Sequence, residues 1–148
     1  MSRDRTILAL EHEVGVMIRR VRRVMLERAR QMHPDLQRAS YLVLTYVAEY
    51  GPVRSSQVAE AFGLDKGTIS RQVQQLVDLG LLERRADPGD RRAALLSLSE
   101  GARERAAEVA GARRRVVAER LWEWSDDELE GFTTAFARYN ESLADPQD

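Results

Sequence analysis

The residues with the most specific chemistry in this chain lie between Asp65 and Leu76. If this segment is a helix with about 100° per residue, Ile69, Val73 and Leu76 share one apolar face. The opposite face has side chains that hydrogen-bond to base edges: Arg to guanine, Gln to adenine, and Ser or Thr to bases or phosphates. Its members are Lys66, Gly67, Thr68, Ser70, Arg71, Gln74 and Gln75. An ordinary amphipathic helix with a solvated face has a similar pattern, so the neighbouring segments must decide between the two interpretations.

A shorter predicted helix precedes this segment, and the two are spaced as a helix-turn-helix. Ala59 is small where two helices would cross, and Ile69 supplies an apolar side chain between them. Gly63 follows the last apolar residue of the shorter helix, where a left-handed backbone costs least in glycine. The apolar face of the shorter helix is predicted to consist of Val58, Ala61 and Phe62. The candidate N-caps of the two helices are Ser55, Ser56 and Asp65.

A β-hairpin is predicted directly after the helix-turn-helix. Residues 81–86 and 93–98 flank a tip that contains a Pro-Gly pair. Asp90 lies two residues before Arg92, close enough to pair with its guanidinium and hold it extended for a narrow minor groove. A surface hairpin that only adds solubility is the alternative. Three residues of the second strand share a face that we expect to pack on the second helix: Ala94, Leu96 and Leu98.

Together, the helix pair and the hairpin predict a surface that binds double-stranded DNA, with one helix in a groove and the hairpin beside it. A module used only for protein contacts would need an apolar outward face on residues 66–78, and this face is polar. An enzyme is disfavoured because His12 and His33 would lie roughly 30 Å apart along one helix, and no phosphate-binding glycine loop or nucleophile elbow is present. Outside the polar helix face, the predicted DNA contacts are Ser55, Arg84, Asp90, Arg91 and Arg92.

The run from Gly80 to Gly101 closely resembles the MarR family of winged-helix transcriptional regulators. The aspartate–x–arginine of that family's wing falls on Asp90 and Arg92, and its recognition-helix pattern falls on residues 68–71. The resemblance covers essentially the whole chain. It implies a homodimer that binds a pseudo-palindromic promoter site and usually represses. It also implies release by a small aromatic or lipophilic effector, or by oxidation.

In the resembled family, the effector pocket lies between the first helix, the start of the second helix and the wing domain. The second helix is expected over residues 36–49, because Gly51 and Pro52 would end it. Met and aromatic side chains suit a flat apolar ligand, but they suit an ordinary core equally well. The nearest candidates for an effector pocket are Met25, Met32, His33, Tyr41 and Tyr46.

The terminal segments are predicted to be helices that join two copies of the chain. One helix is expected from about Thr6 to Met32 and another from Glu100 to Trp124, and a capping box at residues 125–128 would begin a last helix. A twofold dimer would place two recognition helices about 34–36 Å apart. The alternative is that the apolar faces only complete an intramolecular core. The predicted dimer contacts are Ile7, Leu10, Val14, Met17, Leu129, Phe132, Phe136 and Tyr139.

The expected fold is therefore mainly α with a small β-hairpin wing, in a single domain over residues 1–148. Residues of about 36–99 would form a winged helix-turn-helix DNA-binding module. Residues of about 1–35 and 100–148 would form a helical dimerisation region.

Composition sets further limits. The formal net charge is −1, but residues 1–99 hold 16 basic and 12 acidic residues, so the cationic excess lies with the predicted DNA-binding module. The chain has no cysteine, which excludes disulfides, thiolate metal sites and thiol redox switches, and with them the cysteine-based peroxide sensors of the resembled family. No membrane span or signal-peptide core is apparent, so a cytoplasmic protein without a cofactor or metal is expected.

Overall fold

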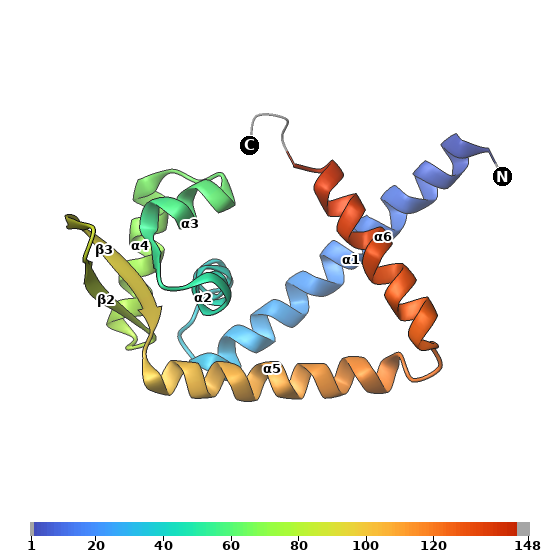
Figure 1. Cartoon of the computed structure of the whole chain (residues 1–148). Coiled ribbons are helices and arrows are strands. Elements are labelled where there is room, and N and C mark those ends of the chain that lie inside the picture. Colours follow the sequence, from blue (N-terminus) through green and yellow to red (C-terminus); the bar gives the residue numbers. More distant parts are fainter. Residues whose placement is uncertain (1, 145–148) are drawn as a thin grey trace. The chain divides into compact units, whose positions relative to one another are not determined.

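The computed structural model describes residues 2–144 as two compact units, which meet between Val109 and Ala110 within one helix. Helices and a small antiparallel sheet make up the first unit, as expected for the fold class (Figure 1). The sheet has three strands in the order β1–β3–β2, so β1 adds a strand that the sequence did not indicate. The elements in chain order are α1 (Arg3–Met32), α2 (Arg38–Tyr50), β1 (Val53–Arg54), α3 (Ser55–Phe62), α4 (Lys66–Asp78), β2 (Leu82–Asp87), β3 (Asp90–Leu98), α5 (Glu100–Arg120) and α6 (Asp126–Ser142).

Local capping explains most of the helix ends. Ser2 caps α1 by accepting a hydrogen bond from the backbone N–H of Arg5, so this helix begins three residues before the predicted start. Helix α2 ends at Tyr50, and Gly51 is its C-cap, as the Gly51-Pro52 pair predicted. Helix α5 ends at Arg120 and does not reach Trp124.

The core of the first unit is formed mainly by α2, α4 and β3. Its fully buried side chains include Leu44 of α2, Ile69 and Leu76 of α4, and Leu96 of β3. The backbone of β3 lies against α2, and β2 is the strand next to α4. Leu96 and Leu98 of β3 lie in the same buried cluster as Ile69, Val73 and Leu76 of α4, as expected for the strand face that was predicted to pack on the second helix, and Ala94 is half-buried.

Two further differences concern the ends of the module. Helix α3 buries Val58 and Ala59, whereas Ala61 is exposed, so the buried face of this helix includes Ala59 in place of the predicted Ala61. The core also includes Met32 of α1 and Ala102 of α5, so the compact unit extends beyond residues 36–99.

The second unit has no fully buried residue in α6. Ser125 caps this helix: its hydroxyl accepts from the N–H of Glu128 at 3.3 Å, and the Glu128 carboxylate accepts from the N–H of Ser125 at 2.8 Å. The hydrogen bonds that the Glu128 carboxylate accepts from Ser125, that from the backbone N–H first and that from the hydroxyl second, lower the pKa of Glu128. The capping box is therefore confirmed. Phe132 contacts the rings of Trp124 and Phe136, with centroid distances of 5.6 and 5.7 Å.

Candidate nucleic-acid interface

The N-terminus of α4 is held by one carboxylate. Asp65 accepts hydrogen bonds from the backbone N–H of Thr68 at 2.8 Å and from its hydroxyl at 2.6 Å. These two bonds, that from the hydroxyl first, lower the pKa of Asp65. Gly63 has φ +59°, the left-handed conformation that its position predicted. The turn therefore fixes where α4 begins relative to α3.

The polar face of α4 is exposed as predicted, because the opposite face is anchored in the core by Ile69 and Leu76. Arg71 is exposed, and its guanidinium donates to the hydroxyl of the half-buried Thr68 at 3.3 Å. This bond directs Arg71 along the helix towards its N-terminus. The remaining exposed members of the face are Lys66, Gly67, Ser70 and Gln74.

Gln75 differs from the other predicted members of this face. It is half-buried, and its side-chain oxygen accepts a hydrogen bond from the hydroxyl of Ser40 of α2, a residue that is 1% exposed. A buried hydroxyl needs a partner, and Gln75 supplies it. Gln75 therefore joins α2 to α4, and its side chain is less exposed than those of Arg71 and Gln74.

Gln74 connects α4 to the wing. Its side-chain oxygen accepts from Arg84 of β2 at 3.0 Å, and its side-chain nitrogen donates to Asp78 at 2.7 Å. Arg84 is thus turned towards α4. The oxygen and the nitrogen of the Gln74 side-chain amide both have partners within the chain. These bonds are exposed, so water can replace them.

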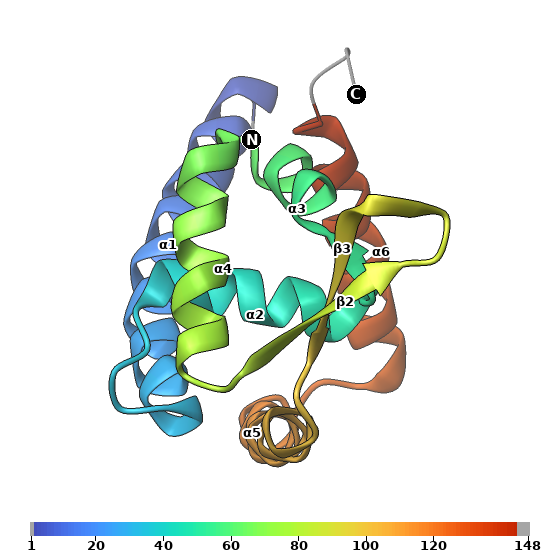
Figure 2. The same cartoon turned by 90° about the vertical axis from the view of Figure 1, so that its left-hand side faces the viewer.

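The β2–β3 hairpin forms a narrow ribbon whose tip extends away from α2 and α4 (Figure 2). Arg91 and Arg92 are exposed near this tip. Asp90 accepts a hydrogen bond from the backbone N–H of Arg92 at 3.0 Å. Within residues 2–144, no ion pair joins Asp90 to the guanidinium of Arg92, so Asp90 shapes the turn and does not hold the side chain as predicted.

The structure shows two charged residues that sequence reasoning missed. Arg54 of β1 donates from Nε to the Asp87 carboxylate of β2 at 2.7 Å. Asp87 also accepts from the backbone N–H of Gly89 at 2.9 Å, and these interactions, that with Gly89 first, lower the pKa of Asp87. An Asp followed by Pro-Gly is typical of such a turn, so Asp87 had a local signal. Arg54 had none, because its partner is 33 residues away.

Arg54 also occupies the N-cap position of α3 that was predicted for Ser55 or Ser56. Its backbone N–H donates to the side chain of Gln57 at 2.8 Å. Ser55 is instead the first residue of the helix and is half-buried.

The five residues predicted to line an effector pocket are not gathered around one of the hollows described here. Met32 and Tyr41 belong to the core, and His33 accepts from the N–H of Asp35. The ring of Tyr46 contacts those of Tyr50 and Phe62, with centroids 4.7 and 5.7 Å away. Met25 alone of the five lines a hollow described here, one of about 430 Å³ between α1 and α2.

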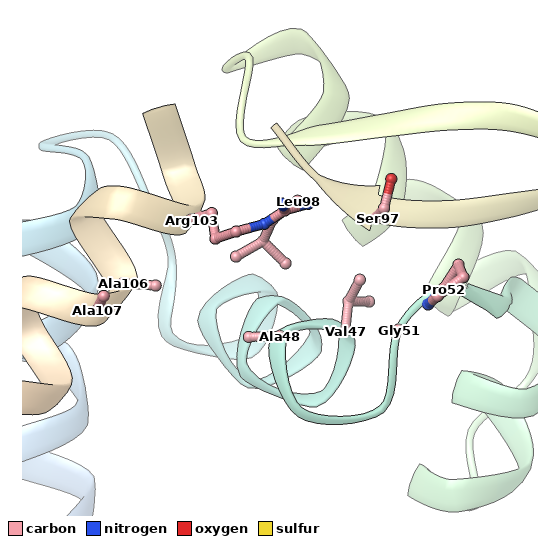
Figure 3. A pocket seen from close by; sticks show the side chains of 9 residues that line it. All are labelled: Val47, Ala48, Gly51, Pro52, Ser97, Leu98, Arg103, Ala106 and Ala107. Carbon is pink, nitrogen blue, oxygen red and sulfur yellow. The ribbon is translucent and has the colours of Figure 1, made fainter. Parts of the chain in front are cut away.

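A second hollow lies between the end of α2, the end of β3 and the start of α5, with a volume of about 380 Å³ (Figure 3). It has a mostly apolar lining that includes Val47, Pro52 and Leu98, and Arg103 is its charged member. None of the predicted effector residues lines it.

Two site classes can be examined directly. In the part of the chain that the structure describes, no group of three or more His, Cys, Asp or Glu side chains is placed to hold a metal ion. Between residues 2 and 144, no helix combines the length and apolar character that are needed to cross a bilayer.

Comparisons with known proteins agree with this geometry. A model of the MarR family matches residues 35–93. The HTH-type transcriptional regulator YxaD of Bacillus subtilis (strain 168) is 32% identical over 145 residues, which cover 98% of this chain and 100% of the relative.

Solved structures show the same fold. RV1404 from Mycobacterium tuberculosis has a TM-score of 0.74 at 21% identity, over 98% of this chain and 97% of that one. A putative MarR family regulator from Listeria monocytogenes, complexed with a 26mer DNA, has a TM-score of 0.73 at 17% identity, over 89% of this chain and 87% of that one. Because a MarR family model matches residues 35–93 and YxaD is similar over 98% of this chain, the chain belongs to the MarR family of winged helix-turn-helix transcriptional regulators.

Proposed function

We propose that this protein regulates transcription by binding a pseudo-palindromic promoter site as a homodimer, and that it acts as a repressor. The observation that carries this proposal is the exposure of the polar face of α4 and of the wing arginines. Helix α4 and the β2–β3 hairpin both lie on the side of the first unit that faces the viewer in Figure 2. A groove-binding helix with a cationic hairpin beside it suits double-stranded DNA. The complex of the Listeria monocytogenes relative with DNA supports the same use of the fold.

The proposed contacts follow from position and chemistry. Arg71 reads a guanine edge, and Gln74 reads an adenine edge together with Arg84. Arg91 and Arg92 enter the minor groove, where the potential is most negative. Contacts that position the protein on phosphates come from the start of α3 and the first turn of α4: Ser55, Lys66, Gly67, Thr68 and Ser70.

The proposed dimer would explain apolar faces that the single chain leaves exposed. On α1, Ile7, Leu10 and Met17 are 45%, 45% and 38% exposed, and Val14 is half-buried. On α6, Leu129 and Phe132 are 40% and 53% exposed, and Phe136 and Tyr139 are half-buried. Faces of this kind are typical of the large apolar interfaces of obligate dimers. Two copies would present two recognition helices to successive turns of DNA.

The proposed regulation is release from DNA by a small aromatic or lipophilic effector. The hollow between α1 and α2 supports this proposal, because its volume of about 430 Å³ lies within the range of ligand pockets. Its lining includes Met25 and Leu42 together with Arg22 and Arg38. Such a lining favours a ligand with an apolar body and an anionic group.

A binding assay with the DNA upstream of the protein's own gene tests the proposal. Fluorescence anisotropy should show tighter binding to this fragment than to a shuffled sequence of equal length, and the affinity should fall steeply with salt. Light scattering at the same concentrations should show the mass of a dimer. Equal affinity for both DNAs at every salt concentration would favour the alternative, a winged-helix module used only for protein contacts.

A further inference from the structure

One ion pair joins the two outer strands of the sheet across the central strand. Arg54 lies in β1 and Asp87 in β2, and β3 lies between these strands. The Nε and Nη2 atoms of Arg54 are 2.7 and 2.5 Å from the same carboxylate oxygen of Asp87. The Asp87 side chain is only 13% exposed, whereas that of Arg54 is 40% exposed. Partial shielding from water makes this interaction stronger than that of a fully exposed pair.

The ion pair lies where the sheet has the least support. β1 is paired with β3 at Leu95 and Leu96, so the hairpin beyond these residues has two strands. The register of β2 and β3 also shifts between Ala86 and Asp87. A two-stranded ribbon is marginally stable by itself, and such an irregularity disrupts its ladder of hydrogen bonds. A further contact is therefore needed to hold the outer end of the wing in one orientation relative to the rest of the sheet.

Asp87 supplies this contact and also orders the turn. One of its oxygens binds Arg54, and the other accepts from the backbone N–H of Gly89. A single carboxylate thus links β1, which is continuous with α3, to the turn that precedes Arg91 and Arg92. The link thus connects the strand that precedes the helix-turn-helix to the tip of the wing.

We propose that Arg54 and Asp87 form a positioning pair, which sets the direction of the wing so that Arg91 and Arg92 meet the minor groove while α4 lies in the major groove. The inference rests on the proposed DNA-binding function. Neither member of the pair has to touch DNA, so both act through the wing.

Hydrogen–deuterium exchange on the free protein tests the pair without DNA. Asp87→Ala should make the amides of residues 86–94 exchange about tenfold faster, while the amides of α4 keep their rates. Glu83→Ala is the matched control, because it also removes one negative charge from β2 but breaks only the exposed Glu83–Arg85 contact. Unchanged wing exchange in Asp87→Ala, or equal acceleration in both variants, would overturn the proposal.

DNA binding supplies the second readout. Asp87→Ala and Arg54→Ala should each reduce the preference for A/T-rich over G/C-rich flanks by roughly threefold, and the double variant should lose no more than either single one. If Arg54→Ala still weakened binding in the Asp87→Ala background, Arg54 would contact DNA directly and the positioning role would be wrong. If the unmodified protein preferred no DNA sequence, the proposed function would fail, whereas the exchange result would still decide whether the pair orders the wing.

Discussion

Replacing Phe132 with Ala should separate the proposed dimer into monomers. Phe132 is 53% exposed in the single chain, and a fully buried aromatic side chain covers about 150–250 Å². An interface would therefore remove about 100 Å² of this side chain from water, which contributes about 2.5 kcal/mol. Twofold symmetry counts the residue twice, so the loss is about 5 kcal/mol. The dimer dissociation constant should rise by roughly three to four orders of magnitude.

Sedimentation velocity from nanomolar to micromolar concentrations measures this change, and circular dichroism at each concentration checks that the variant remains helical. Thr134→Ala is the matched control, because Thr134 is exposed about 200° around α6 from Phe132. Binding to a complete operator should weaken in Phe132→Ala, whereas binding to a half-site should not change. A dissociation constant for Phe132→Ala that equals that of the control would refute the reasoning, because Phe132 would then lie outside any interface.

Four more predictions follow from single contacts. Arg71→Ala should cost about 1–3 kcal/mol of DNA affinity, seen as lost preference at one base pair per half-site when operator variants are compared by anisotropy. Arg92→Ala should weaken binding most at A/T-rich flanks, and an equal loss at G/C-rich flanks would contradict insertion into the minor groove. Ser40→Ala should lower the free energy of unfolding by roughly 1–3 kcal/mol, measured with urea, because Gln75 loses its donor; an unchanged midpoint would contradict this role. The pKa of Asp65 is lowered from 3.8 in the folded protein. The ionised Asp65 carboxylate therefore stabilises the fold above pH 3.8, and this stabilisation is lost as the pH falls through the lower, folded-state pKa. Asp65→Asn should remove this part of the acid dependence of the thermal midpoint.

Most of the fold was predictable because local signals set it. The spacing of Ile69, Val73 and Leu76 predicted α4, Gly63 predicted the turn before it, and Ser125 predicted the start of α6. The turn and capping signals each involve four or fewer consecutive residues, and the apolar pattern recurs within a single helix. Local patterns of this kind can be read without knowledge of distant contacts.

Some differences were local, such as the turn role of Asp90, but others concern residues whose surroundings come from distant parts of the chain. Gln75 was predicted to be exposed because its position on α4 points away from the apolar face of that helix. Ser40, 35 residues earlier in the sequence, instead donates a hydrogen bond to its side chain. Arg54 pairs across the sheet with Asp87, and β1 itself depends on β3. The exposed apolar face of α6 is not explained by a distant contact within the chain, because no part of the described chain covers it fully. The proposed explanation is a second copy of the chain.

If Gln74 reads a base as proposed, its two hydrogen bonds within the chain would make that reading an exchange of partners. In the free protein its amide oxygen faces a donor, Arg84, and its amide nitrogen faces an acceptor, Asp78. Adenine offers the same pair in the major groove, a donor at N6 and an acceptor at N7, and can replace both partners. Guanine offers acceptors at the corresponding atoms and would satisfy only the nitrogen. The proposed discrimination would therefore come from the difference between the hydrogen bonds that Gln74 loses within the chain and those that it gains from the base.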